Sequence, residues 1–298
     1  MTTSTLVQEA RINQPPFVNN LLSNPGFEIW QRGAGPFVGS NDVYAADEWV
    51  ISNGSTASRT TDCRFGQYAL TSSVSGATLS VVAGIERYTS LEGQWLTFSV
   101  WVKTTIAGTA AQIFDHTAAG NQGGTSINSH SGSGQWEQLT AVKEVRIGLT
   151  PNTIDVNWPH NWGLLVSVFI GVVGTNSFTI DGAVCAAGYF PEGLPYVPLN
   201  PAEDMERCSR FYQAEPATYD ATIFSGYVTS GNVYDIQRPF PTQMSAVPTV
   251  TYLTGGQSRF PAGAPTYFVS SVNGMMIRKV ANSTGEGYHW SRQSMEVT

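Results

Sequence analysis

The sequence carries little charge, and what it carries excludes one large class of partner. Asp, Glu, Lys and Arg make up 12% of its 298 residues, about half the usual share for soluble domains. The net charge is −7, with only 15 Lys and Arg residues. No basic surface is available to neutralise the phosphates of a nucleic acid. We therefore expect no nucleic-acid partner.

Cysteine is also scarce, and its spacing fits no common metal or redox motif. Cys63, Cys185 and Cys208 are an odd number and form no CxxC pair. Three buried, reduced thiols are the simplest interpretation, and it favours a protein made in a reducing compartment. One disulfide with a leftover thiol is the alternative.

Long apolar runs are missing as well. The longest run, residues 163–174, is too short to span a bilayer and has the length of a buried strand. Residues 1–20 contain no basic region followed by an apolar core, so we expect no signal peptide. These two features predict a protein without membrane insertion, made in a cytoplasm.

Strand patterns separated by Gly, Ser and Asn fill most of the chain. Trp95–Lys103 alternates, and its core face should carry Leu96, Phe98, Val100 and Val102. Similar short strands over residues 20–198 predict a jelly-roll β-sandwich. Residues 1–19 lack periodicity, and we expect an extended N-terminal arm there, with a disordered tail as the alternative.

The strongest helix signal lies at Asn200–Gln213. Asn200 is a good N-cap, Pro201 suits the first helical position, and Glu203 completes a capping box. Glu203 also stands four residues before Arg207, the favourable order for an ion pair along a helix. We therefore predict a short helix that links two β-regions.

One face of this predicted helix is apolar. Met205, Cys208 and Tyr212 follow a helical spacing, and a helix this short needs such a stripe to be covered. We expect the stripe to face the core of a β-domain. Arg207 and Arg210 then become candidates for contacts between subunits.

Residues 199–298 combine this helix with a small antiparallel β-domain. Five strands are expected there, at residues 221–228, 232–237, 248–253, 267–271 and 275–279. The chain as a whole is predicted to be all-β: a jelly-roll β-sandwich, a short linking helix and a small antiparallel domain.

Two pairs of motifs resemble known families. NLLSNPGFEIWQRG (20–33) and FTIDGAVCAAGYFPEG (178–193) resemble the first and last strands of carbohydrate-binding-module-like jelly-rolls. NPAEDMERCSRFYQ (200–213) and RPFPTQMSAVPTVTY (238–252) resemble the C-terminal part of bacteriophage tail-fibre and related virion proteins. The matching positions of the second pair are Glu203, Met205, Arg207, Cys208, Arg210, Phe211, Tyr212, Phe240, Pro241, Met244, Pro248, Thr249 and Val250.

The resemblance to virion proteins implies a phage or prophage structural protein at the particle surface. It implies a homotrimer, assembled in the host cytoplasm and located in the virion, with residues 1–19 available to contact other virion proteins. A tail fibre, a head fibre and a capsid decoration all remain open.

The resemblance to jelly-rolls implies one metal site. In that family a calcium ion often ties the first strand to the last, and Glu28 and Asp181 fall in the matching segments. The alternative is that these carboxylates cap a turn or pair with an arginine. We expect no other cofactor.

Catalytic motifs are absent from the sequence. None of the four histidines pairs with a nucleophile motif, and no Walker loop, HExxH or GxSxG is present. Asp115, Glu137 and Asp155 are candidates for glycoside hydrolysis only because they are acidic. We predict a protein that is not an enzyme.

Tryptophan points instead to sugar binding. Trp136, Trp158 and Trp162 lie in or beside expected loops, and Trp101 lies on the non-core face of its strand. Flat aromatic rings stack well on sugar rings. The alternative is that these rings fill a core or a subunit interface, as we expect of Trp49 and Trp95.

Three functions remain after these exclusions. The first is attachment of a virion to host surface glycans. The second is a purely architectural role, as a decoration, head fibre or adaptor without a ligand. The third is degradation of host polysaccharide by a tail protein.

Overall fold

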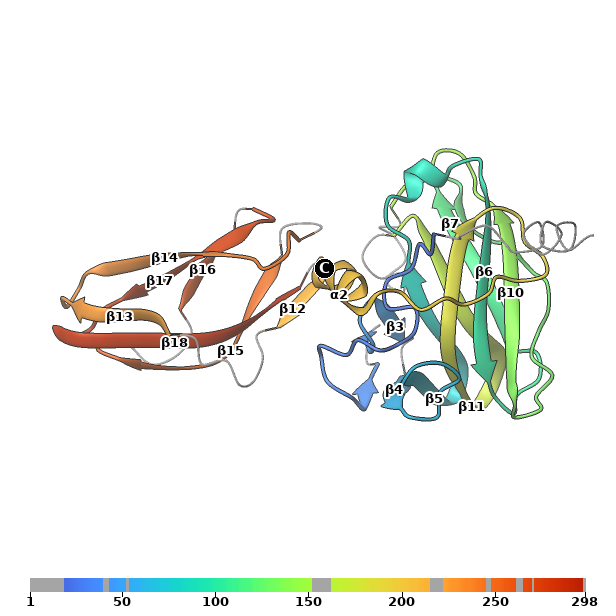
Figure 1. Ribbon diagram of the computed structural model, residues 1–298, viewed down its shortest axis with the longest axis horizontal. Coiled ribbons are helices and arrows are strands. Elements are labelled where there is room, and N and C mark those ends of the chain that lie inside the picture. The colour runs from blue at the N-terminus through green and yellow to red at the C-terminus, as the bar shows by residue number, and fades with distance from the viewer. Residues whose placement is uncertain are drawn as a thin grey trace, which may run out of the picture. The chain divides into compact units, whose positions relative to one another are not determined.

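A computed structural model describes residues 19–39, 43–51, 54–151, 162–214, 222–244, 248–260, 265–269 and 271–296 (Figure 1). The chain divides into two compact units, Met1–Asn200 and Pro201–Thr298. The fold is all-β, as predicted. Among the described residues α2 is the one α-helix, and it is neither long nor apolar enough to cross a membrane.

Among its described residues the first unit has eleven strands and one short 3-10 helix, and all strand pairs are antiparallel. Their bounds are β1 (Phe37–Val38), β2 (Val43–Tyr44), β3 (Trp49–Ile51), β4 (Ser55–Thr60), β5 (Ala69–Gly84), η1 (Tyr88–Leu91), β6 (Trp95–Lys103), β7 (Ala110–Thr117), β8 (Gly120–Gly123), β9 (Thr125–Ser126), β10 (Trp136–Glu144) and β11 (Leu164–Ala187).

Two long strands, β5 and β11, join the two layers of this unit. Residues 69–74 of β5 pair with β4, whereas residues 81–83 pair with β3. Residues 179–187 of β11 pair with β6, whereas residues 164–169 pair with β7. The front sheet therefore comprises β1, β4, β6, β9 and β10, and the back sheet β2, β3, β7 and β8. Each sheet is completed by one half of β5 and one half of β11.

A bulge marks the place where β11 passes between the sheets. The register with β5 shifts between Ile170 and Asn176. The Asn176 amide is almost fully buried and donates to the carbonyls of Ala77, at 2.9 Å, and Val172, at 2.6 Å. The Asn176 side chain thus donates hydrogen bonds to carbonyl groups that lose their backbone partners where the β-ladder is interrupted.

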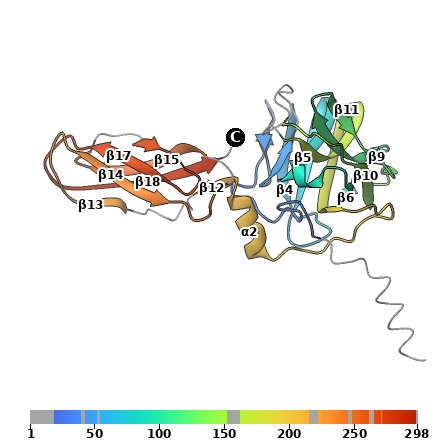
Figure 2. The same cartoon turned by 90° about the horizontal axis from the view of Figure 1, so that it is seen from above.

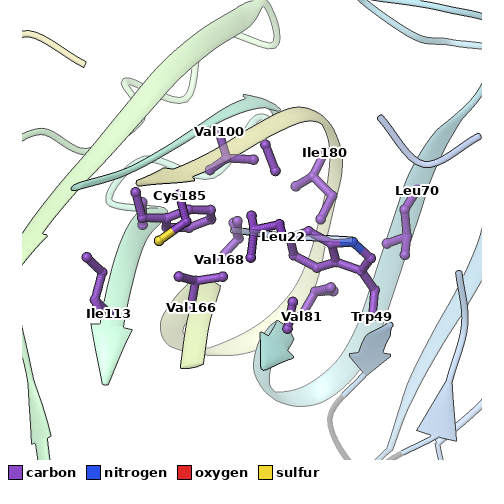
Figure 3. Close-up of a cluster of buried hydrophobic side chains, with 14 of the residues drawn as sticks. Leu22, Trp49, Leu70, Val81, Val100, Ile113, Val166, Val168, Ile180 and Cys185 are labelled. Carbon is purple, nitrogen blue, oxygen red and sulfur yellow. The ribbon is translucent and has the colours of Figure 1, made fainter. Parts of the chain in front are cut away.

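The core lies between the two sheets and confirms the predicted face of β6. Leu96, Phe98, Val100 and Val102 are all fully buried. Trp49 is fully buried as well, as predicted for this residue. Figure 3 shows side chains from both sheets gathered there: Leu22, Trp49, Leu70, Val81, Val100, Ile113, Val166, Val168, Ile180 and Cys185.

Residues 20–33 lie beside the last part of β11. The Asn20 side chain donates to Ala183 O, at 2.9 Å, and accepts from Cys185 N, at 3.0 Å. A turn forms at residues 23–27, but no strand is present on either side of it, contrary to expectation. The reason is that side chains replace a ladder, since the buried Asn24 amide bonds to the backbone of Ile29 and Asp47.

The segment that follows β11 crosses the outer surface of the front sheet, and we call residues 188–198 the strap. In Figure 1 it runs across the strands toward α2. The Thr97 hydroxyl donates to Gly188 O, the Ser99 hydroxyl accepts from Leu194 N, and the Gln138 amide donates to Leu194 O. Outward-facing polar side chains of β6 and β10 thus bind the backbone of the strap.

The second unit begins with α2 (Pro201–Ser209), and seven strands follow in the part of it that the structure describes. They are β12 (Tyr212–Ala214), β13 (Thr222–Val228), β14 (Val233–Pro239), β15 (Thr249–Ser258), β16 (Thr266–Phe268), β17 (Gly274–Val280) and β18 (Gly285–Glu296). β18 pairs with β12 and β13 along one edge and with β15 along the other. β14, β17 and β16 form a second sheet, in that order, and Figures 1 and 2 show β14 beside β17.

A small core holds the second unit together. It contains Phe240 and Met244, two residues of the motif that resembles virion proteins. Both are less than 10% exposed. The other buried members are Met275, Ile277 and Met295.

The helix differs from its prediction in length and in its buried face. It ends at Ser209, a turn follows, and Tyr212 belongs to β12, where it pairs with Glu296. Cys208 is fully buried, but Met205 is 42% exposed, so the predicted apolar stripe is not one continuous buried face. The predicted ion pair is confirmed, with Arg207 Nη2 at 2.7 Å from Glu203 Oε1. Arg210 lies in the turn, and its contacts with another subunit stay a prediction.

Candidate functional site

One row of side chains crosses the outer surface of the front sheet. Ser58 pairs with Thr71, Thr71 with Thr179, Thr179 with Lys103, and Lys103 with Trp136. Directly paired residues of antiparallel strands point to the same face. We call these five residues the outer row. With strands about 4.8 Å apart, the row spans roughly 19 Å.

The outer row faces away from the core. Its neighbours along the strands, such as Leu70, Val102 and Ile180, are fully buried between the sheets, and side chains alternate along a strand. The Thr179 hydroxyl donates to the Thr71 hydroxyl at 3.3 Å, which shows that these side chains meet. The row therefore offers hydroxyl groups, one amine and one indole at the surface.

Trp101 lies in the next row, one step along β6. It pairs with Asp181 of β11 and Gln138 of β10. Trp101 and Trp136 are both half-buried and stand on neighbouring strands of the same face. The structure thus brings together two of the four tryptophans that the sequence proposed for sugar binding.

The loop between β4 and β5, residues 61–68, covers part of this face. The Arg64 guanidinium carbon lies 3.6 Å from the centroid of the Trp101 ring. Phe65 meets Trp101 edge-on, with centroids 6.2 Å apart, and also packs on Tyr196 of the strap at 4.9 Å. Lys103 Nζ lies 2.7 Å from Asp62 Oδ2. The loop is therefore tied to both rows.

Two carboxylates hold the backbone of this loop. Asp181 Oδ2 accepts from the amides of Arg64, at 2.8 Å, and Phe65, at 2.7 Å. Glu28 Oε1 accepts from the amides of Gln67 and Tyr68. Gly66, at φ +61°, must stay a glycine, because a Cβ atom there would overlap the Glu28 carboxylate.

These contacts bear on the calcium prediction. N–H groups point their positive ends at Asp181 Oδ2 and Glu28 Oε1, where a cation would need free acceptors. Among the described residues no three His, Cys, Asp or Glu side chains gather into a metal site. The observed arrangement is that of carboxylates capping a turn, and calcium binding by this pair stays a prediction.

The Asp181 carboxyl has an unusually high pKa. The carboxyl is fully buried, and burial raises its pKa to about 6. Amide donors from Phe65, Arg64 and Gly182 oppose this shift, while the nearby Glu28 charge adds to it. The Asp181 carboxyl, which accepts hydrogen bonds from the 61–68 loop, therefore changes its protonation state in a mildly acidic pH range.

Trp162 does not join this face. Trp162 is 9% exposed and packs with Val50 and Leu165 on the back sheet. Its indole lies against Gly84, where any side chain would collide with it. Trp162 is thus buried, which was the alternative to an exposed ring, because a glycine on the neighbouring strand leaves room for it. Trp158 lies outside the described residues.

Trp95 was expected to fill a core or a subunit interface. It does not belong to the core, because it is 41% exposed and packs edge-on against Tyr189 at 4.9 Å. Trp95 begins β6, at the end opposite Lys103, so it stands far along the strand from the outer row.

Sequence reasoning missed Arg64 and the hydroxyl residues of the outer row. A signal existed, because hydroxyl residues recur along β4 and β5. Ser55 and Ser72 are nearly fully buried, however, so hydroxyl residues occupy both faces of these strands. Only the register between strands singles out the row.

Two of the three acidic residues considered for hydrolysis, Asp115 and Glu137, are held in structural contacts. Asp115 is fully buried, 2.8 Å from Arg146 Nε and 3.3 Å from Lys143 Nζ. Glu137 accepts from the Ser131 and Ser133 hydroxyls and the Ser131 amide, and these bonds lower its pKa to about 2. Asp155 lies outside the described residues.

The three cysteines are free thiols, the simpler of the two interpretations. Cys185 and Cys208 are buried, and Cys63 is half-buried in the 61–68 loop. Burial raises the pKa of the Cys63 thiol, and the charges of Asp181 and Glu28 add to the shift. This thiol is therefore less reactive than a free one.

No protein-family model and no curated protein matches the chain. Among solved structures, the CBM22-1 xylan-binding domain of Paenibacillus barcinonensis Xyn10C matches 58% of this chain and 97% of its own, with 12% identity and a TM-score of 0.40. A family 22 carbohydrate-binding module of Clostridium thermocellum Xyn10B matches 58% and 96%, with 14% identity and a TM-score of 0.37. Tailspike protein 4 of bacteriophage CBA120 matches 58% and 22%, with 16% identity and a TM-score of 0.34. These are similarities of fold alone.

Proposed function

We propose that the outer face of the front sheet binds a glycan without hydrolysing it. The observation that carries this proposal is the outer row, a line of hydroxyl groups and one amine that ends on the indole of Trp136. An indole stacks on the apolar face of a sugar ring, while hydroxyl and amine groups bond to its edges. A row of this length can meet several consecutive sugars.

The glycan-binding face would serve a virion surface protein that attaches the particle to its host. This part of the proposal is supported by the order of the sequence motifs. In the second unit Phe240 and Met244 of the virion-like motif belong to the buried core, so the motif supplies part of that core. A homotrimer, with residues 1–19 bound to other virion proteins, completes the proposal.

The proposal is tested by binding of the purified chain to an array of host-surface polysaccharides. Trp136→Ala should weaken binding at least tenfold, because it removes the stacking ring. Trp95→Ala is the matched control, since it removes another exposed indole of the same sheet that lies away from the outer row. Affinity electrophoresis and calorimetry measure both.

Three results would overturn or redirect this proposal. Absence of binding to any glycan would favour a purely architectural role. Equal loss in Trp95→Ala and Trp136→Ala would place the site elsewhere. Release of reducing sugar from a bound polysaccharide would show that the protein degrades its ligand.

A further inference from the structure

The side chain of Arg64 takes no part in the hydrogen bonds that hold the 61–68 loop. Its backbone amide bonds to Asp181, but its guanidinium only stacks, on Trp101 at 3.6 Å and more loosely on Phe65 at 5.6 Å. Among the described residues no acceptor bonds to this guanidinium, and the side chain is exposed. Five N–H donors are thus held in one plane beside the outer row without a partner.

Among the described residues no carboxylate forms an ion pair with the Arg64 side chain. Lys103 also stands in the outer row, but Asp62 neutralises it through bonds of 2.7 and 3.0 Å. The Asp181 carboxyl is buried beneath the loop, where it accepts backbone amides. Arg64 therefore places beside the row a cation that forms no ion pair with the described residues, while the Glu28 and Asp181 carboxylates hold the backbone of the loop.

Stacking prepares this guanidinium for one kind of ligand. A planar guanidinium matches a carboxylate through two parallel N–H bonds, and stacking on an aromatic ring fixes the plane of the fork before binding. Less conformational freedom is then lost when the ligand binds. A neutral sugar would leave both the charge and most of the donors unused.

We propose that the glycan bound at the outer row is acidic, and that Arg64 binds the carboxylate of a uronic acid in it. This inference rests on the proposed function. The sugar rings follow the outer row and stack on Trp136, while one carboxylate reaches the guanidinium above Trp101. Sulfate groups could satisfy the same donors, so the experiment separates the two anions.

The ligand side is tested with polymers that differ only in charge. Polygalacturonate, alginate and hyaluronate are each compared with their carboxyl-reduced forms, which keep the linkages and lose the acid. We expect at least one acidic polymer to bind, and its reduced form to bind about tenfold more weakly, the loss expected for charge-assisted hydrogen bonds. Dextran sulfate, a glucan that carries sulfate esters and no carboxylate, should bind less well than the best uronate polymer.

The protein side is tested with two arginine variants. Arg64→Gln keeps the backbone amide that holds the loop, so the fold should persist, as checked by thermal unfolding. It should lower affinity for the acidic polymer about tenfold and leave affinity for the reduced polymer unchanged. Arg59→Gln is the matched control. Arg59 also stacks on a ring, Tyr68 at 4.2 Å, but it follows Ser58 on β4 and so points to the other face.

The outcomes keep this inference apart from the proposed function. If the protein binds neutral and reduced polymers as well as acidic ones, and loses that binding in Trp136→Ala, the glycan site stands and the acidic ligand is refuted. If Arg64→Gln and Arg59→Gln lowered the affinity for the acidic polymer equally, the effect would come from the overall charge of the protein and not from a carboxylate site at Arg64. Preference for dextran sulfate would replace the carboxylate with a sulfate. No binding of any polymer would refute both proposals.

Discussion

At the scale of single residues, polar side chains of the first unit replace missing backbone pairing. Asn24, Asn176 and Asp181 are each buried, and each bonds to backbone groups of a segment that belongs to no strand or to an interrupted one. Buried polar groups need such partners. These contacts were beyond sequence reasoning, because an Asn in a turn looks the same whether it is buried or exposed.

Asp181 gives a pH dependence with a defined sign. Its pKa is raised from 3.8 to about 6, so the folded protein binds this proton more tightly than the unfolded chain. The stabilisation is complete below about pH 4 and is lost as the pH rises through 6. We expect a loss on the order of 2 kcal/mol in the free energy of unfolding over that range.

Urea unfolding at several pH values between 4 and 7 measures this effect. Asp181→Asn cannot titrate, so its free energy of unfolding should change less over the same range, although the variant loses one acceptor for the loop amides. A pH profile parallel to that of the wild type would assign the titration to other groups.

At the scale of elements, strands with a regular alternation of apolar and polar residues could be predicted from the sequence, and irregular strands could not. The core face of β6 followed from Trp95–Lys103 alone. β5 and β11 are long strands that contain Gly76 and Gly174. The ladder continues past both positions through a bulge. β18, the strand that joins the larger sheet of the second unit, was missed, because its sequence is rich in Gly and charge.

The helix α2 allows a matched pair of substitutions. Cys208 is fully buried and Met205 is 42% exposed. Cys208→Asp buries an unpaired charge and should destabilise the second unit by about 3 kcal/mol or more. Met205→Asp introduces the same group at the surface and should change stability by about 0.5 kcal/mol at most.

Hydrogen exchange measured separately for the two units resolves this comparison. We expect Cys208→Asp to speed exchange within residues 201–298 while the first unit keeps its protection. Protection equal to that of the wild type in Cys208→Asp would mean that the Cys208 site admits water or rearranges at little cost.

At the scale of the whole molecule, the sequence predicted the fold class and part of the candidate site. Trp101 and Trp136 were named from the sequence, but their common face depends on the register between β6 and β10. For Trp162 the choice between an exposed and a buried ring stayed open, because the space over Gly84 comes from a strand about eighty positions earlier. Arg64 had no motif, since its role depends on a loop that folds back over β6.

The oligomeric state is a prediction at this scale. The resemblance to virion proteins implies a homotrimer, so sedimentation equilibrium should give three times the mass of the chain. Removal of residues 1–19 should leave that mass ratio unchanged and abolish incorporation into particles. A monomer at micromolar concentration would contradict the trimer, and full incorporation of the truncated chain would contradict the role of the arm.

The strap has a mechanical consequence. Because residues 188–198 lead directly to α2, a pulling force on the second unit enters the first unit through Tyr196 and Leu194. The bonds of Leu194 to Ser99 and Gln138 are then loaded before any strand of the core. Eleven released residues extend the chain by at most about 40 Å and uncover Val184 and Ala186, which pack against Leu194. Under tension the first unit yields at its surface while its sandwich stays closed.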